Sequence, residues 1–352
     1  MPKLDQYTSL KIARLSFVAA ILVVAIHNTF RISEFGALPP VFAWAQLAVN
    51  CGITRMAVPF FFVVSGYFLF RDYEPSLGWW GKKLKKRACT LGLPYITWIV
   101  LGLIQIALLN AVRANPQEIA WRDWSWWLAA VGITGVPVAM ITFWFVRILI
   151  IAVLIAPVLG FVLRELGAVV VMLVLISGVF YERAILNWLF IVAGADIAIN
   201  GTPKVFKTVQ ENRWSGLFFG IAWAALVVLR TYCEAKGVAL DGWLENLCVI
   251  TMNISGIAFM WLLYNKVNAD KIMGWIDPFL KSAFFLYAAH PFVALLRDAL
   301  LKPAAYDSYS FAYVLAVLYG SYIAMIIVPV AVWCLLKRHA PRAVCLCLFG
   351  DR

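Results

Sequence analysis

Apolar runs recur along almost the whole chain, each close to the roughly 20 residues that a helix needs to cross about 30 Å of hydrocarbon. They lack the alternating polarity of strands in a transmembrane barrel. The sequence therefore predicts an all-α fold, a polytopic membrane bundle of about ten transmembrane helices. The candidate spans lie at residues 12–30, 53–70, 90–110, 141–163, 166–181, 184–200, 214–230, 246–265, 282–300 and 311–336.

Composition excludes a soluble domain, because 64% of the 352 residues are hydrophobic and 14% are charged, against about 25% charged in soluble domains. The net charge of +12 would suit nucleic acid, but cytoplasmic loops of membrane proteins also collect Lys and Arg during insertion. We interpret the charge as topology and predict no nucleic-acid partner. The seven cysteines are scattered, and the one close pair, Cys345 and Cys347, lacks further ligands, so no metal site is predicted.

The distribution of the 30 Lys and Arg residues predicts the orientation of the bundle. With a cytoplasmic N-terminus, Arg55 and Arg147 fall inside spans, and all but eight of the others fall on the inner side. Both termini are therefore predicted to be cytoplasmic. The short spans 166–181 and 184–200 could instead form one re-entrant unit, which would invert everything after them. The outer eight are Arg31, Arg113, Arg122, Arg183, Arg230, Lys236, Arg297 and Lys302.

No internal repeat or soluble segment divides the chain, so a single membrane domain over residues 1–352 is predicted, with a short basic tail at 337–352. The first helix is expected to be retained, because no small-residue cleavage site follows it. The outer segment 111–140 contains "WRDWSWW" at residues 121–127. This stretch is interpreted as an interfacial aromatic belt, with a surface lid as the alternative.

Ionisable side chains inside a bilayer cost roughly 2.5–3.5 kcal/mol each, so they usually face a cavity, pair with one another or reach the interface. His27 lies sixteen residues beyond Lys11, which places it roughly 24 Å along its helix, near the outer boundary. This helix alone favours a hydrogen-bonded or interfacial imidazole over a reactive one. Asp196 is interpreted as structural.

Arg55 begins the second span at about the depth of His27, and Pro59 deprives the Arg55 carbonyl of its helical partner, so a kink is predicted there. Arg147 is placed near the outer end of its own span. Either arginine could instead reach the interface. His290 lies near the middle of the ninth span, where Pro291 frees the carbonyl of Tyr287. The positions predict one cluster of His27, Arg55 and Arg147 at the outer third of the bundle, with His290 deeper. Histidine accepts protons near neutral pH and arginine stabilises oxyanions, so such a set suits acyl transfer.

Four segments, "FVAAILVVAIHNTF", "TRMAVPFFFVVSGYFLF", "TFWFVRILIIAVLIAPVL" and "KSAFFLYAAHP", resemble in order and spacing the signature helices of the acyltransferase-3 family of bacterial membrane acyltransferases. The first two are also similar to the membrane domain of vancomycin-resistance serine racemases. The resemblance implies an enzyme of the bacterial cytoplasmic (inner) membrane. It implies transfer of an acyl group, expected to be acetyl, from cytoplasmic acyl-CoA to a hydroxyl of a surface polysaccharide or glycolipid.

The resemblance also implies roles for individual residues. His27 and Arg55 match the family's conserved histidine and second-helix arginine and become the catalytic candidates. Acyl-CoA is expected as donor substrate, with no permanently bound cofactor, and membrane lipids and the acceptor glycan as partners. The candidates for contact with acyl-CoA or substrate are Arg14, Ser16, Lys86, Arg87, Trp144, Arg147, Tyr287 and His290.

Two positions depart from the family pattern. Ser16 stands where relatives have an arginine eleven residues before the histidine, and Thr90 replaces the second arginine of a basic pair. Arg14 is the nearest substitute for the first, but points about 140° away from His27 on an ideal helix. Residues 1–352 contain no segment expected to form an esterase domain, so transfer is expected to be completed by this domain or by a separate periplasmic partner. A transporter or flippase of glycans or lipid-linked sugars is the alternative function, and a scaffold for a biosynthetic complex is a third.

Overall fold

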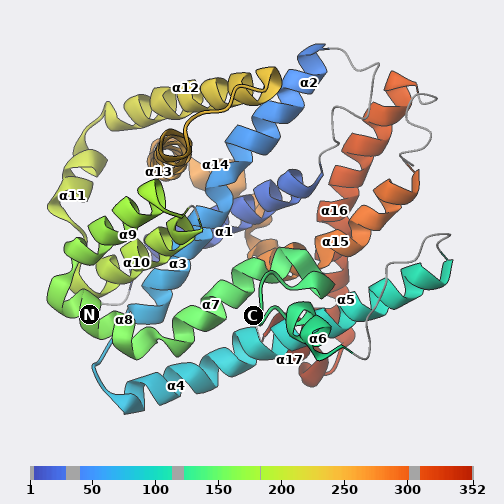
Figure 1. Cartoon of the computed structure of the whole chain (residues 1–352), viewed down its shortest axis with the longest axis horizontal. Helices are drawn as coiled ribbons and strands as arrows, with labels where there is room; N and C mark the ends of the chain where they lie inside the picture. Colours follow the sequence, from blue (N-terminus) through green and yellow to red (C-terminus); the bar gives the residue numbers. More distant parts are fainter. Residues whose placement is uncertain (1–3, 29–39, 113–122, 183, 301–309, 351–352) are drawn as a thin grey trace. The chain divides into compact units, whose positions relative to one another are not determined.

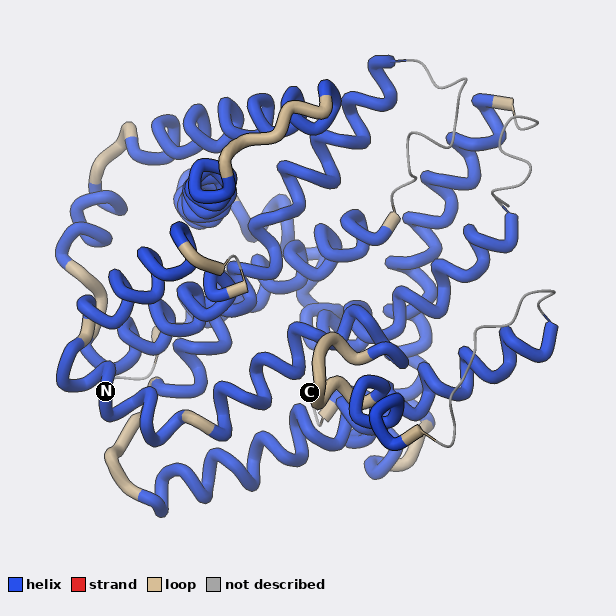
Figure 2. The backbone as a smooth tube through the Cα atoms, viewed as in Figure 1, coloured by secondary structure: helices blue, strands red, loops and turns tan. Residues whose placement is uncertain are grey.

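The computed structural model describes residues 4–28, 40–112, 123–182, 184–300 and 310–350. All regular elements in these residues are helices, and none of the described residues forms a strand (Figure 2). The predicted all-α class is therefore confirmed for this part of the chain. Seven cations used to predict the orientation lie outside it, namely Lys3, Arg31, Arg113, Arg122, Arg183, Lys302 and Arg352.

Contacts divide the chain into two compact units. The first combines Met1–Tyr73 with Gly160–Val330, and the second combines Glu74–Leu159 with Ala331–Arg352. The single domain expected over residues 1–352 stays a prediction. Elements that begin in the first unit are α1 (Gln6–His27), α2 (Pro40–Leu47), η2 (Ala48–Gly52), η3 (Ile53–Met56), α3 (Ala57–Phe70), α9 (Ala168–Phe180), α10 (Ile185–Asn200), α11 (Lys204–Glu211), α12 (Ser215–Lys236), α13 (Gly242–Lys266), α14 (Ala269–Met273), η6 (Gly274–Ser282), α15 (Ala283–Leu300) and α16 (Phe311–His339). Those that begin in the second are α4 (Leu77–Arg87), η4 (Ala88–Gly92), α5 (Leu93–Val112), α6 (Trp124–Ala130), η5 (Val138–Phe143), α7 (Trp144–Leu154), α8 (Ala156–Leu166) and α17 (Arg342–Phe349).

Seven helices in the described residues are long and apolar enough to cross a membrane, and two bent pairs raise the number to as many as nine. The pairs are α7 with α8, bent by 72°, and α10 with α11, bent by 97°. The count of ten is therefore not confirmed. The shortfall lies at 166–181, where α9 has only 13 residues, or about 20 Å of rise. The protein is a multi-pass membrane protein, while the cytoplasmic placement of its termini stays a prediction.

Helix α1 begins where Asp5 accepts a hydrogen bond from the Thr8 backbone N–H at 2.8 Å. This bond and a second one from the Thr8 hydroxyl hold the pKa of the Asp5 carboxyl below its ordinary value. The second span is interrupted before α3, as its proline predicted. A π-helical turn, η2, and a 3₁₀ turn, η3, replace regular helix there, and Gly52 has non-helical φ and ψ angles of −123° and −81°.

Helices α3 and α10 pack with their backbones almost in contact. A Cβ atom added to Gly66 of α3 would lie 2.1 Å from the carbonyl oxygen of Ile191, and one added to Gly194 of α10 would lie 2.0 Å from that of Val63. Reciprocal glycines of this kind let membrane helices approach closely without a hydrophobic driving force between them. The close contact fixes α3 against α10 at this level.

Helix α1 also packs against α3 and α15. The side chains between α1 and the α14–α15 segment form a core that contains Phe17, Ala20, Val24, Ile276, Leu286 and Ala294, with Met325 of α16. Small residues on α1 bring the two helices together along this core. The last residue of α1 and the middle of α15 therefore lie side by side.

In the second unit, α4, η4 and α5 follow one another as one long rod (Figure 1). The predicted basic tail contains a helix, α17, that packs against this rod: Trp98 Nε1 donates to the Leu348 carbonyl at 2.8 Å, and Phe349 is buried. Trp126 and Trp127 of the predicted aromatic belt make an edge-to-face pair at 5.2 Å in α6. Residues 121 and 122 of that belt lie outside the described residues.

Candidate functional site

Two histidines 263 positions apart in sequence meet in the first unit. His27 is the last residue of α1 and His290 lies in the middle of α15, and their ring centroids are 5.1 Å apart with the planes inclined by 36°. His27 is exposed, whereas His290 is completely buried. The pair therefore places an exposed imidazole next to one that is completely buried in the bundle.

Backbone geometry fixes the proton on His290. Pro291 has no N–H, so the Tyr287 carbonyl, four residues earlier, lacks its helical donor. Nδ1 of His290 lies 2.7 Å from that carbonyl oxygen. Because a carbonyl oxygen only accepts, Nδ1 carries the proton, and Nε2 of the neutral ring presents a lone pair. Nε2 is buried and has no hydrogen-bond partner among the described residues.

A second set of bonds holds the end of α1 in place. Arg297 Nη1 donates to the His27 carbonyl oxygen at 2.7 Å, which satisfies an acceptor left open by the helix end. Next to it, Asn28 Nδ2 donates to the Leu318 carbonyl at 2.9 Å, and the Ser321 hydroxyl donates to Asn28 Oδ1 at 3.0 Å. Helices α15 and α16 thus position the His27 backbone. Arg297 appeared in the sequence only as an outer cation, and no local signal marks its partner.

Arg55 lies in the 3₁₀ turn η3, where the interrupted helix leaves backbone carbonyls available. Its Nε donates to the Asn50 carbonyl at 2.6 Å, and its Nη2 donates to the Asn50 side-chain oxygen at 3.4 Å. Helix α1, which ends at His27, contacts η3, the turn that carries Arg55. The structure therefore brings η3 next to α1, places the His290 ring against that of His27, and adds Arg297, while the place of Arg147 relative to this group stays a prediction.

Arg14, the candidate substitute for the family's missing arginine, is buried and fully engaged. Its Nε and Nη2 donate to the two carboxylate oxygens of Asp277, each at 2.8 Å. Its Nη1 donates to Asp270 at 2.7 Å and to the Tyr264 hydroxyl at 3.1 Å. Ser16 is half-buried on the same helix. Contact of either residue with acyl-CoA stays a prediction.

Four further candidates lie in the second unit. Lys86 is exposed and Arg87 is half-buried in the last turn of α4. Trp144 and Arg147 occupy the first turn of α7, three residues apart and hence on one helix face, and both are half-buried. Whether these four side chains reach the histidine pair stays a prediction.

These observations define an integral membrane protein with a polar site built between its helices. The chain belongs to the acyltransferase-3 family, because the family profile, described as an acyltransferase domain, matches residues 15–334. The match contains His27, Arg55, Arg297 and His290. The protein is accordingly an acyltransferase by family.

Two curated relatives are similar over parts of the chain. The succinoglycan biosynthesis protein ExoH of Rhizobium meliloti (strain 1021) is 22% identical over 272 residues, which cover 72% of this chain and 69% of ExoH. An amino-acid racemase of Enterococcus faecalis is 31% identical over 105 residues, which cover 29% of this chain and 13% of the racemase. No solved structure matches the chain.

Proposed function

We propose that the protein is an O-acyltransferase of the bacterial cytoplasmic membrane, which moves an acetyl group from cytoplasmic acetyl-CoA to a hydroxyl of a surface polysaccharide or glycolipid. Family membership supports the reaction class. The relative named for succinoglycan biosynthesis supports a polysaccharide acceptor. The single observation that carries the mechanism is the pairing of accessible His27 with buried His290.

His27 acts as general base in this proposal. It takes the proton from the acceptor hydroxyl as the oxygen attacks the thioester carbonyl carbon, and the resulting imidazolium returns the proton to the thiolate of CoA when the carbon–sulfur bond breaks. The products are the ester and free CoA. An acyl group carried transiently on His27 would give the same products in two steps.

His290 supports His27 through its lone pair. Its Nδ1 proton is committed to the Tyr287 carbonyl, so Nε2 can only accept. A positive charge on the neighbouring ring is stabilised by such an acceptor more than the neutral ring is. His290 thereby favours the protonated intermediate of His27 without taking part in bond formation.

Arginines supply the remaining charges. Arg55 stabilises the oxyanion that forms on the thioester carbonyl, and Arg297 holds the His27 backbone. On the inner side, Lys86 and Arg87 receive the phosphates of CoA, with Trp144 and Arg147 further along the path of the pantetheine arm. A transporter would instead move glycan without a donor, and the family gives that alternative no support.

The test is acetyl transfer by the purified protein in liposomes, with radiolabelled acetyl-CoA and the glycans of the host strain. Replacement His27→Ala should lower kcat by about 10²–10⁴-fold, the usual contribution of a general base. His339→Ala is the matched control, since it removes the third histidine of the chain, at the exposed end of α16, and should leave the rate unchanged. A folded His27→Ala protein with the normal rate would refute the proposal.

A further inference from the structure

Helix α11 of the first unit is strongly amphipathic, yet none of its eight residues is buried. Val205, Phe206 and Val209 share one face of the helix, and Lys204 and Lys207 lie on the opposite face. The side chain of Val205 is 73% exposed and that of Phe206 is 42% exposed. The apolar face is therefore largely uncovered by the described residues, and no residue of α11 takes part in the mechanism above.

The backbone turns α11 across the direction of the preceding helix, α10. The two helices are bent by 97° at the break between them. Gly201 makes the turn with a φ angle of +89°, a conformation that suits glycine, and Pro203 precedes the new helix. Helix α10 packs against α3, and α12, which follows α11, is long and apolar enough to cross a membrane. A helix at right angles to α10, placed before a span, runs along a bilayer surface and not through it.

Hydrogen bonds at the end of α11 place it at the level where spans leave the membrane. Lys266, the last residue of the candidate span α13, donates from Nζ to the Arg213 carbonyl. Asn212 Oδ1 accepts from the Trp214 backbone N–H at 2.9 Å, just before α12 begins. The segment 201–214 also contains four charged side chains, all exposed, and each would be unfavourable in hydrocarbon. The segment therefore lies at the interface between lipid and water.

The cations of this segment are exposed and have no carboxylate partner among the described residues. In that part of the chain, neither Lys204 nor Lys207 makes an ion pair or a side-chain hydrogen bond. The Arg213 guanidinium lies 5.0 Å from the centre of the Trp214 ring, an arrangement that leaves its N–H groups available. The segment has three basic residues and one acidic residue, so its net charge is positive. Ammonium and guanidinium groups of this kind donate to phosphate oxygens.

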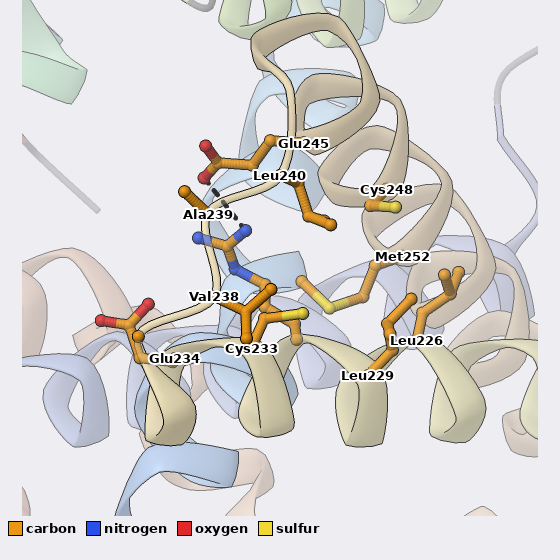
Figure 3. Close-up of a pocket in the computed structure, with 12 residues that line it drawn as sticks. Leu226, Leu229, Cys233, Glu234, Val238, Ala239, Leu240, Glu245, Cys248 and Met252 are labelled. Atoms are coloured by element: carbon orange, nitrogen blue, oxygen red, sulfur yellow. Dashed lines mark hydrogen bonds and ion pairs between the residues drawn. The ribbon is translucent and has the colours of Figure 1, made fainter.

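The opposite end of α12 has a different charge. Residues 230–245 contain two basic and three acidic residues. Arg230 Nη1 donates to Glu245 Oε1 at 3.2 Å, beside a pocket of about 250 Å³ (Figure 3). Helix α12 has 22 residues and rises about 33 Å, so its two ends lie at opposite bilayer surfaces. Exposed Lys236, near the second end, therefore provides a control cation at the other surface.

We propose that α11 is an interfacial helix that binds the surface of a bilayer rich in anionic phospholipid. Its apolar face lies among the acyl chains just below the headgroups, and Trp214 lies at headgroup level. Lys204, Lys207 and Arg213 lie within about one Debye length, roughly 8–10 Å, of the headgroup phosphates. The contact holds the turn between α10 and α12 at a fixed depth. This inference concerns the membrane and does not rest on acyl transfer.

The experiment uses the full-length protein in nanodiscs with a small fraction of photoreactive phosphatidylglycerol or photoreactive phosphatidylcholine. Each lipid carries its diazirine near the start of an acyl chain. Peptide mass spectrometry compares labelling of residues 205–214 with labelling of α9, which contains no charged residue and exposes Val169, Met172 and Leu173. The ratio of phosphatidylglycerol label to phosphatidylcholine label should be several-fold higher on α11 than on α9.

The double substitution Lys204→Gln with Lys207→Gln tests the charge. Both side chains are exposed, so the fold should be unchanged. Each lysine near an anionic surface is expected to contribute a preference of about fivefold, so the ratio on α11 should fall towards that on α9. Lys236→Gln is the matched control and should leave the ratio on α11 unchanged. In the wild-type protein, NaCl at about 1 M shortens the Debye length to about 3 Å and should lower the ratio without any substitution.

Three results would overturn the proposal. Equal ratios on α11 and α9 in the wild-type protein would mean that α11 does not select anionic lipid. Absence of label from residues 205–214 with both lipids would mean that water or another protein covers the apolar face. A ratio that neither the double substitution nor salt lowers would refute the role of the two lysines. None of these measurements depends on acyl transfer, so a failure here leaves the proposed function unaffected.

Discussion

Helix α1 contributes to two polar clusters, one in its N-terminal half and one at its C-terminal end. The two clusters differ in whether all of their buried hydrogen-bonding groups have partners. In the first half, the Arg14 guanidinium donates four hydrogen bonds, to Asp277, Asp270 and Tyr264. At the C-terminal end, His27 faces His290, whose buried Nε2 has no partner among the described residues. In both clusters, the side chains that face α1 come from residues 264–300.

The difference separates a structural cluster from a reactive one. Buried polar groups are nearly always hydrogen-bonded, because an unpaired one costs the full desolvation penalty. The Arg14 cluster obeys this rule and has little capacity left for a ligand. The histidine pair breaks the rule at one atom, as several buried side chains elsewhere in the described residues also do. What distinguishes His290 is that its ring lies beside the exposed ring of His27, so an open acceptor there can serve a reacting group. Each prediction below alters one side of this comparison.

The largest effect is expected at the Arg14 cluster. Arg14→Met removes the four hydrogen bonds of a buried guanidinium, while its partners Asp277 and Asp270 are exposed enough to be hydrated, so Tm should fall by about 5–10 °C. Thermal unfolding in detergent measures it. The fraction that remains folded should keep its kcat. A variant with normal Tm and reduced kcat would indicate that Arg14 takes part in the reaction, and would support its predicted contact with acyl-CoA.

The second-largest effect is expected at Nε2 of His290, the buried acceptor of the histidine pair. His290→Asn preserves a donor at the position of Nδ1 for the Tyr287 carbonyl but deletes Nε2, so kcat should fall by about 10–100-fold while Tm changes little. His290→Gln, which places its amide nearer the position of Nε2, should lower kcat less if Nε2 matters. Steady-state kinetics with calorimetry compares the two. Equal kcat in wild type and His290→Asn would contradict a catalytic contribution of the pair.

A smaller effect is expected at Arg297, which has a structural bond to the backbone of the reactive residue His27. Arg297→Gln weakens the bond to the His27 carbonyl and should cost about 1.5 kcal/mol of stability, the lower range for hydrogen bonds to a charged group. Because His27 would lose its fixed position, kcat should also fall several-fold without a change in the KM for acetyl-CoA. Asp298→Asn, which alters only the exposed partner of Arg297, serves as the control. Loss of acetyl-CoA affinity in Arg297→Gln would instead indicate a donor contact.

The smallest effect is expected at Tyr264, in the Arg14 cluster. Tyr264→Phe deletes one 3.1 Å hydrogen bond donated by the Arg14 guanidinium, which keeps its three shorter bonds to Asp277 and Asp270, so the free energy of unfolding should fall by about 0.5–1.5 kcal/mol. Activity should be that of the wild type at every acceptor concentration. A clear drop in kcat with unchanged stability would show that the two clusters are coupled along α1.

The sequence predicted the parts of this arrangement that depend on local chemistry. Apolar runs marked the helices, Pro59 marked the break near Arg55, and Pro291 marked the carbonyl that now orients His290. These features follow from the few residues around them. His27 and Arg55 were also singled out by the family resemblance, but the contact between His27 and His290 was not predicted, because His290 was placed deeper in the bundle.

Other parts depend on contacts between distant segments and could not be read in advance. Asp270 and Asp277 carry no signal that they bind Arg14, more than 250 residues earlier. Arg297 was counted as one of the outer cations because its partner, a backbone carbonyl, has no sequence signature. The count of ten spans is not confirmed, because 166–181 is apolar enough for a span while α9 is too short to form one alone.

The reciprocal glycines of α3 and α10 have a mechanical consequence for the site. Gly66 and Gly194 lock the two backbones together, so α3 can neither slide nor rotate against its neighbour. Immediately before this locked helix, η2 and η3 are wound irregularly and carry Arg55. The nine residues Ala48–Met56 thus continue from a fixed helix, and Gly52 among them packs closely against Val227 of α12, so the backbone that carries Arg55 is supported from two sides.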